Sequence, residues 1–254
     1  MGTRLGQESL ILPKPLVRIG RHPILLHIMA SYIKLGHTSF IICAGYKADQ
    51  VKSYFRDFSL SSSDPTYSIS LDSNSVVLKK SSTIHDSLGL ASKEFQVEIV
   101  DTGLTSTTAE RLMRVSDLIE DDTFLCTYGD GVTSQNLNDV IEHHFRKNLM
   151  ATLTAFHPPS RFGEIVVDEN SCVTSFKEKP LVKSYVNGGF FVFNKKIFSI
   201  IDPYKSLEEG LLSKLAELKQ LTAYKSEAFW QMMDTPREVE ILKQMYAQGN
   251  APWL

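Results

Sequence analysis

The feature that most constrains the fold is an alternation of short apolar runs with amphipathic segments along most of the 254 residues. Short runs rich in β-branched and aromatic residues predict strands, whereas apolar residues at helical spacing predict helices. The predicted strands are 39–43, 96–100, 124–127, 151–156, 164–167, 173–176, 189–193 and 221–224. The predicted helices are 23–34, 49–55, 108–119, 137–147, 207–218 and 236–248. Strands that alternate with helices form βαβ units, so we expect an α/β fold with a mixed, mainly parallel sheet.

One segment interrupts this alternation. Residues 59–93 are rich in serine and weakly apolar, with polar alternation at 67–71 and 75–78. We expect a surface insertion made of a hairpin and a loop, and the alternative is a poorly ordered connection. No internal repeat and no linker rich in Pro or Gly divides the chain. We therefore expect a single domain spanning 1–254.

The composition excludes several functional classes. Lys and Arg number 27 against 29 Asp and Glu, without a basic block, which argues against a nucleic-acid partner. Cys43, Cys126 and Cys172 are far apart and embedded in apolar runs, so we expect buried free thiols in a reducing compartment. No apolar run is long enough to cross a membrane, and no leader opens the chain. These observations predict a cytoplasmic protein that binds no membrane.

Two short strings near the start combine cations with residues that shape the backbone. In Gly2-Thr3-Arg4, glycine allows close approach to phosphate oxygens, and arginine can add a charge-assisted clamp. Lys14 lies between Pro13 and Pro15, which predicts a stiff, extended loop that presents the ammonium group. Such a cation suits charge stabilisation of a phosphoryl transition state. The alternatives are a frayed terminus for the first string and a surface turn for the second.

Two aspartates stand at predicted element ends. Asp130, in Tyr128-Gly-Asp-Gly-Val132, follows the predicted strand 124–127, and ligands of parallel sheets bind at such strand ends. Asp234 precedes Thr235-Pro236, the predicted start of the last helix. Mg²⁺ usually takes only one or two protein carboxylates, so the two aspartates could share one ion. The alternatives are a simple turn at Asp130 and a helix N-cap at Asp234.

A third group suits an anionic second substrate. Lys179, in Phe176-Lys-Glu-Lys-Pro180, ends another predicted strand, and Asn187-Gly-Gly189 begins the next. Glu178 can accept sugar hydroxyls while Lys179 meets a phosphate, although a solvated hairpin end is the alternative. The seven histidines show no ligand spacing, and neither G-x-S-x-G nor G-x-G-x-x-G occurs. The absence of these motifs argues against a hydrolase or a dehydrogenase.

Together, these strings resemble bacterial glucose-1-phosphate cytidylyltransferases within the sugar nucleotidyltransferase family, over residues 2–253. The strings shared with the wider family are GTR, PKP and EKP, while Val100-Asp-Thr-Gly103 and Phe229-Trp-Gln-Met-Met-Asp-Thr235 are more specific to the cytidylyl branch. The resemblance implies a three-layer, Rossmann-like nucleotidyltransferase fold. In it, residues 1–150 would form a nucleotide-binding portion, and 151–254 a sugar-binding portion with the C-terminal helix.

The implied reaction is transfer from CTP to α-D-glucose 1-phosphate, giving CDP-glucose and pyrophosphate for the synthesis of surface polysaccharides. Mg²⁺ is the implied cofactor, held by Asp130 and Asp234, and we expect a homo-oligomer. The implied catalytic residues are Lys14, Arg4 and Asp130. The implied nucleotide-binding residues are Gly2, Thr3, Arg4, Lys14, Thr102, Gly103, Arg111 and Asp130. The implied sugar-phosphate residues are Glu178, Lys179, Asn187 and Gly188. The alternatives are a sugar nucleotidyltransferase that uses UTP or dTTP, and an inactive paralogue that binds nucleotide sugars.

The sequence departs from the family pattern in three places. The family has a strand and a glycine-rich run before GTR, where this sequence has Met1, so we expect a gap beside two central strands. A fragment, a different start and a real loss of that strand remain alternatives. The family T-G-G-R is replaced by Thr108-Ala-Glu-Arg111, whose added carboxylate we expect to affect base or ribose contacts. The family W-E-x-E-P is replaced by Ser206-Leu-Glu-Glu-Gly210, which we expect to alter support of the sugar site.

Overall fold

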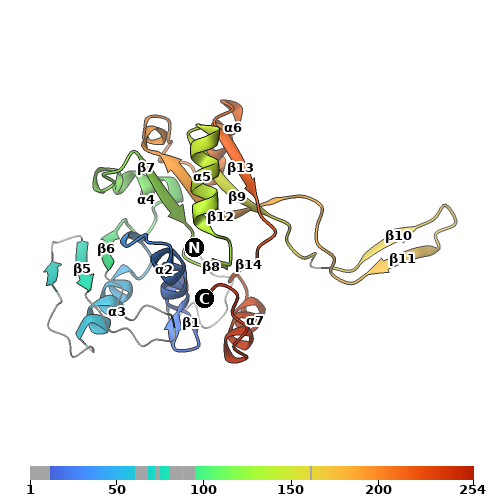
Figure 1. Cartoon of the computed structure of the whole chain (residues 1–254), viewed down its shortest axis with the longest axis horizontal. Helices are drawn as coiled ribbons and strands as arrows, with labels where there is room; N and C mark the ends of the chain where they lie inside the picture. Colours follow the sequence, from blue (N-terminus) through green and yellow to red (C-terminus); the bar gives the residue numbers. More distant parts are fainter. Residues whose placement is uncertain (1–11, 61–67, 72–74, 81–87, 89–94, 161) are drawn as a thin grey trace.

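A computed structural model of the chain describes residues 12–60, 68–71, 75–80, 88, 95–160 and 162–254 (Figure 1). Two four-stranded sheets form its centre, with strand orders β3-β6-β5-β4 and β13-β9-β12-β7. The first sheet contains β3 (Ser39–Ala44), β4 (Ser68–Leu71), β5 (Ser75–Lys80) and β6 (Phe95–Asp101). The second contains β7 (Thr123–Thr127), β9 (Ala151–Phe156), β12 (Val186–Asn194) and β13 (Leu221–Lys225). In the described part of the chain, β3 and β7 each end the order of their sheet.

The sheets are mixed, and their ladders are less parallel than the alternation of elements predicts. Only β3–β6 and β13–β9 run parallel in the two described sheets, while β12 pairs antiparallel with both β7 and β9. The reason lies in the connections. A projecting hairpin, rather than a crossover helix, joins β9 to β12, and the β4–β5 hairpin pairs with β6 through β5. The described sheets are therefore mixed, as predicted, but they are not mainly parallel.

Helices cover these sheets. They are α2 (Ile24–Lys34), α3 (Ala48–Leu60), α4 (Thr108–Arg114), α5 (Leu137–Lys147), α6 (Ser213–Glu217) and α7 (Pro236–Ala247). Shorter helical segments accompany them in the described part of the chain: η2 (Lys14–Leu16), η4 (Ser116–Leu118), η5 (Lys195–Ser199) and η6 (Leu207–Leu212), the last a π-helix. The predicted helix at 108–119 is thus split between α4 and η4, and the one at 207–218 between η6 and α6.

The layers follow from the two faces of β12. Phe191 and Phe193 point into one core with α4, η6 and α6, whereas Phe190 belongs to a second core with α2, α7 and the start of α5. Side chains alternate between the faces of a strand, so apolar residues at successive positions predict burial on both sides. A sheet between two helical layers is the predicted three-layer α/β arrangement, and this fold class is confirmed.

The predicted insertion at 59–93 contains the expected hairpin, β4–β5, in the described residues. Its strands begin and end within a few residues of the predicted ones. Through β5 it extends the first sheet by pairing with β6, so it is part of the sheet rather than a separate surface hairpin. Residues 1–11, on which the prediction about the first strand depends, lie outside the described residues.

The three cysteines are free, as predicted. Cys43 and Cys126 are half-buried on β3 and β7, and burial raises their pKa values to about 11 and about 12. Cys172 is exposed, so its predicted burial is wrong. It lies between the two strands of a hairpin that projects away from the other described elements. Of the helices in the described part of the chain, none is both long and apolar enough to span a membrane.

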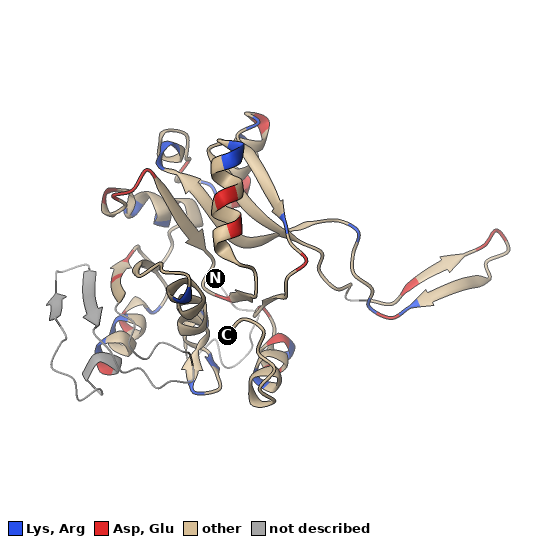
Figure 2. Ribbon diagram, viewed as in Figure 1, with Lys and Arg blue, Asp and Glu red and all other residues tan. Residues whose placement is uncertain are grey.

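That hairpin is an arm made of β10 (Glu164–Val167) and β11 (Val173–Lys177), and it projects far from the body of the molecule (Figure 1). Ile165 pairs with Phe176 and Val167 with Val173, so these four apolar side chains share one face. All four are exposed. Charged residues stand at the tip and at the body end of the arm (Figure 2).

Candidate active site

A short two-stranded ladder brings Asp130 and Asp234 together. Strand β8 (Gly131–Thr133) pairs antiparallel with β14 (Trp230–Met232), and Met232 lies opposite Gly131. One step further, the Met233 N–H donates to the Asp130 carbonyl oxygen at 2.8 Å. Asp234 therefore leaves the ladder beside Asp130, although the two residues are far apart in the sequence. The sequence predicted that these two aspartates meet. It did not predict the ladder that joins them, because strands of three residues show no readable periodicity.

The helix cap beside Asp234 is provided by Thr235. Its hydroxyl accepts from the Glu238 N–H, and the Glu238 carboxylate accepts in turn from the Thr235 N–H, which completes a capping box. The N–H of Asp234 also donates to this carboxylate, at 2.7 Å. The Asp234 carboxylate itself takes no part in the cap. The N-cap interpretation therefore belongs to Thr235, and the Asp234 side chain remains available for a cation.

Lys14 is held between these two carboxylates. Its Nζ donates to Asp130 Oδ2 at 2.5 Å and to Asp234 Oδ1 at 2.5 Å. The predicted extended loop is wrong here, since Lys14 begins the 3₁₀ turn η2, closed by the Leu16 N–H bonding to the Pro13 carbonyl at 2.8 Å. Pro15 faces Gly129, where an added Cβ would lie 3.2 Å from its ring. This close approach sets the lysine beside the Asp130 turn.

The electrostatics of this cluster follow from partial burial. Side-chain exposure is 15% for Lys14, 20% for Asp130 and 36% for Asp234. Burial by itself lowers the pKa of Lys14, but the charges and hydrogen bonds of Asp130 and Asp234 outweigh it and raise the pKa, so the ammonium stays charged. Burial, together with the nearby Asp234 charge, raises the pKa of Asp130 although Lys14 opposes this. Two carboxylates facing one ammonium leave a net negative charge.

These residues fit a hard divalent cation. Both carboxylate oxygens contact one nitrogen, so they are close enough to share an ion, and oxygen is the ligand atom that Mg²⁺ prefers. Among the described residues no group of three or more His, Cys, Asp or Glu side chains could hold a metal. Such a site therefore offers two protein ligands. Mg²⁺ sites that complete their shell with water and substrate phosphate have this composition.

The predicted nucleotide residues of the first sheet lie together. Arg111 on α4 donates to the Thr102 hydroxyl at 3.0 Å, and that hydroxyl donates to the Ala44 carbonyl at 2.7 Å. The Gly103 N–H donates to Asp101 Oδ1 at 2.9 Å, and Gly103 has a φ of +92°, which favours glycine. Thr102, Gly103 and Arg111 thus meet at the ends of the parallel strands β3 and β6.

Two neighbouring residues bear on this arrangement, of which Gly45 was not predicted to matter. A Cβ at Gly45 would lie 1.8 Å from the Arg111 guanidinium, so this glycine provides the space that the arginine occupies. The substituted Glu110 pairs with Arg114 at 2.7 Å on the exposed side of α4. Its carboxylate is therefore paired with Arg114, about one turn along α4 from Arg111. The glycine in Ala44-Gly45-Tyr46 was the available signal for the first of these.

A second cluster surrounds Tyr128, two residues before Asp130, and joins the predicted Asn187 to two residues that were not predicted as site residues. Its hydroxyl contacts the Glu208 carboxylate in η6 and accepts from Asn187 Nδ2 at 3.3 Å. Burial and the Glu208 carboxylate raise the pKa of Tyr128 well above its ordinary value, so the phenol is neutral. A π-helix such as η6 often marks a functional site. The structure therefore brings Asn187 beside the Asp130 turn, and Glu208 with it.

The remaining predicted residues are placed differently. Gly188 accepts from Trp230 Nε1 through its carbonyl at 2.8 Å, next to β14. Glu178 and Lys179 lie beyond β11 at the body end of the arm, both exposed, and pair with each other at 2.5 Å. Gly2, Thr3 and Arg4 lie outside the described residues. The described cluster is thus Lys14, Asp130 and Asp234, with Asn187 close by.

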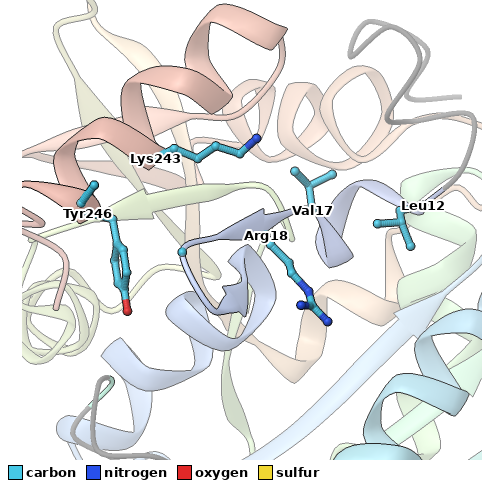
Figure 3. A pocket seen from close by; sticks show the side chains of 7 residues that line it. Leu12, Val17, Arg18, Lys243 and Tyr246 are labelled. Atoms are coloured by element: carbon cyan, nitrogen blue, oxygen red, sulfur yellow. The ribbon is translucent and has the colours of Figure 1, made fainter.

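A separate cavity of about 470 Å³ lies between β1 (Arg18–Ile19) and α7 (Figure 3). Val17, Arg18, Lys243 and Tyr246 contribute to its walls, and its lining includes none of the predicted site residues. Gly20 closes one side with a φ of +64°, and an added Cβ there would lie 2.1 Å from the Tyr246 ring. This cavity is distinct from the lysine and aspartate cluster.

Comparison with known proteins agrees with the fold. The sequence profile described as nucleotidyl transferase matches residues 1–235, most of the chain. The chain therefore belongs to the nucleotidyl transferase family. Within that family it is 40% identical to the glucose-1-phosphate cytidylyltransferase of Salmonella typhi over 256 residues, with 100% of this chain and 95% of that protein covered. It is equally similar, at 40% over 256 residues, to the protein of the same name from Salmonella typhimurium, with the same coverage.

A solved structure supports the fold from a greater distance. The inositol-1-phosphate CTP transferase from T. maritima superposes with a TM-score of 0.62 at 16% sequence identity. The match covers 98% of this chain and 93% of that one. At this identity the similarity concerns the fold alone, and it agrees with the three-layer arrangement.

Proposed function

We propose that this protein transfers a cytidylyl group from CTP to α-D-glucose 1-phosphate, forming CDP-glucose and pyrophosphate. The observation that carries the proposal is the cluster of Lys14, Asp130 and Asp234 in a chain that belongs to the nucleotidyl transferase family. Sequence identity of 40% to glucose-1-phosphate cytidylyltransferases over the whole chain supports the choice of both substrates.

The reaction needs no protein nucleophile. An oxygen of the sugar phosphate attacks the α-phosphorus of CTP, and a new P–O bond forms as the bond from that phosphorus to the bridging oxygen breaks. Pyrophosphate carries away the released electron pair. The protein's task is to place the two phosphates in line and to neutralise the charge that develops. A cluster of one lysine and two metal-binding carboxylates suits this task better than an acid–base pair would.

Each group in the cluster then has a role. Asp130 and Asp234 hold Mg²⁺, which when bound neutralises phosphate charge and orients the triphosphate. Lys14 stabilises the negative charge of the triphosphate, and so does Arg4. Thr102, Gly103 and Arg111 contact the nucleotide, together with Gly2 and Thr3. Residues 1–150 form the nucleotide-binding portion of one domain spanning 1–254.

The sugar phosphate binds to the other portion, 151–254. Asn187 contacts Tyr128, two residues before Asp130, where a second phosphate must approach the first, and Gly188 follows Asn187 on β12. Glu178 and Lys179 accept sugar hydroxyls and meet the phosphate, respectively. Because these two pair with each other and are exposed, they must exchange that contact for substrate. We add Tyr128 and Glu208 as positioning residues for Asn187.

The choice of nucleotide rests on similarity and is open to direct test. Pyrophosphate release is measured with glucose 1-phosphate and each of CTP, UTP, dTTP, ATP and GTP in turn. We expect CTP to give the highest kcat/KM by a wide margin. Equal rates with UTP or dTTP would move the chain to another branch of the family, and no release with any nucleotide would support an inactive paralogue.

We also propose that the protein forms a homo-oligomer in the cytoplasm and works in polysaccharide biosynthesis. The arm supports self-association, because Ile165 and Phe176 are 55% and 63% exposed on one apolar face. A two-stranded hairpin with such a face is marginal in water and gains from a partner. Light scattering on Ile165→Ser with Phe176→Ser should show a smaller species than the parent, whereas Val166→Thr on the opposite face should not. An unchanged mass in the double variant would exclude the arm as the contact.

A further inference from the structure

Lys14 stands where a metal shared by the two aspartates would have to stand. Its Nζ lies 2.5 Å from an oxygen of Asp130 and 2.5 Å from an oxygen of Asp234. Ligand oxygens surround Mg²⁺ at about 2.0–2.1 Å. An ammonium group and a divalent cation of like charge cannot both lie between the same two oxygens. Either the lysine or the ion occupies that place.

Without a metal, the Lys14 ammonium group supplies the positive charge that the two carboxylates need. Asp130 is mostly buried, and a buried carboxylate without a counter-ion is costly. A single ammonium bonded to both aspartates relieves their mutual repulsion. One positive charge against two negative ones still leaves the cluster negative. A divalent cation would balance it completely, so the cluster retains an attraction for such an ion.

The backbone around Lys14 allows the exchange. Pro13, Pro15 and the 3₁₀ turn hold the main chain of η2, and Gly129 admits the Pro15 ring closely. The lysine side chain, by contrast, has a flexible four-carbon stem with a compact charge at its end. Its ammonium group can therefore turn away from the carboxylates without any movement of the loop.

We propose that Lys14 is the internal counter-ion of Asp130 and Asp234, which leaves them when a divalent cation binds and then pairs with the triphosphate. This inference rests on the proposed metal-binding role of the two aspartates. Without nucleotide, a displaced ammonium group has lost two carboxylates and gained only water. With a nucleoside triphosphate present, it gains a new anionic partner. Metal and nucleotide therefore bind cooperatively, and each strengthens the other by the same factor.

Mn²⁺ binding followed by electron paramagnetic resonance tests this directly. Free Mn²⁺ is measured with the protein alone and with the protein and CTP, without sugar phosphate and with correction for Mn²⁺ bound to CTP. In Lys14→Met the lysine no longer competes. We expect this variant to bind Mn²⁺ about tenfold or more tightly than the parent without nucleotide, and to gain less from CTP. Lys14→Arg should bind Mn²⁺ weakly like the parent, and so should Lys34→Met, which removes an exposed lysine on α2.

The outcomes separate this inference from the proposed function. Equal Mn²⁺ affinity of Lys14→Met and the parent, with equal enhancement by CTP, would overturn the exchange and leave the metal site standing. No Mn²⁺ binding by any variant, with or without CTP, would overturn both. Circular dichroism checks that Lys14→Met is folded. If it is not, the ¹⁵Nζ resonance of Lys14 in the parent must shift when Mg²⁺ and CTP are added together, and an unmoved resonance would overturn the exchange.

Discussion

The buried histidine of α2 gives the protein a calculable loss of stability in mild acid. His27 is fully buried. Its Nε2–H donates to the Ile19 carbonyl at 2.9 Å, and its Nδ1 accepts from Trp253 Nε1 at 3.2 Å. The ring also meets Tyr246 of α7 edge-on at 5.5 Å between centroids. One neutral imidazole thus joins β1, α7 and the C-terminal residues.

Burial, with a smaller contribution from the His22 charge, lowers the pKa of His27 to about 4 from an ordinary value of 6.5, although the hydrogen bond to Ile19 opposes the shift. Between these pH values His27 is protonated in the unfolded chain and neutral in the folded chain. The stability is therefore complete above pH 6.5 and falls as the pH is lowered toward 4. One pKa unit corresponds to about 1.4 kcal/mol, so this group removes about 2 kcal/mol between pH 7 and pH 5. That is a substantial part of a typical total of 5–15 kcal/mol.

Urea unfolding at pH 7 and pH 5, followed by tryptophan fluorescence, measures this loss. His27→Gln is the matched variant, because its amide can still donate to the Ile19 carbonyl but does not titrate. The two proteins share every other titrating group, so the difference between their losses belongs to His27. The parent should lose about 2 kcal/mol more than the variant. Equal losses in the two proteins would refute the assignment of a buried neutral histidine.

Two further predictions concern substrate binding. Gly189→Ala adds a Cβ 2.4 Å from the Tyr128 ring at a φ of +79°. It should therefore lower the free energy of unfolding by about 1–3 kcal/mol and raise KM for glucose 1-phosphate. An unchanged melting temperature and KM would contradict this. Gly45→Ala places its Cβ against the flexible end of Arg111. It should raise KM for CTP several-fold and leave KM for glucose 1-phosphate unchanged. If both constants rise equally, the arginine does not act on the nucleotide alone.

Much of this arrangement could be predicted from local patterns. Helix α5 and strands β9 and β10 have the predicted bounds, because a 3.6-residue or two-residue periodicity with clear end signals is readable in a single sequence. The meeting of Asp130 and Asp234 was predicted from their places at element ends. Long-range pairing carried no comparable signal. Antiparallel pairing of β12 with two strands depends on contacts that periodicity does not encode.

The parts that escaped prediction share this cause. Tyr128 and Glu208 are 80 positions apart, and nothing local shows that a phenol will meet that carboxylate. Lys14 was predicted in an extended loop because a residue before proline usually avoids helical backbone, and packing of Pro15 on Gly129 overrides that preference. Exposure of Cys172 followed from the projection of the arm, which apolar neighbours in the sequence did not reveal.

The most direct test of the proposed chemistry is CDP-glucose formation by Asp130→Asn across a magnesium series, with Asp117→Asn on the exposed side of η4 as control. Asparagine keeps the shape of the side chain but removes the charge that a shared Mg²⁺ requires. Turnover should fall by roughly a hundredfold or more at saturating magnesium, while circular dichroism and the control remain like the parent. Full activity of Asp130→Asn at limiting magnesium would contradict the assignment of this cluster as the catalytic centre.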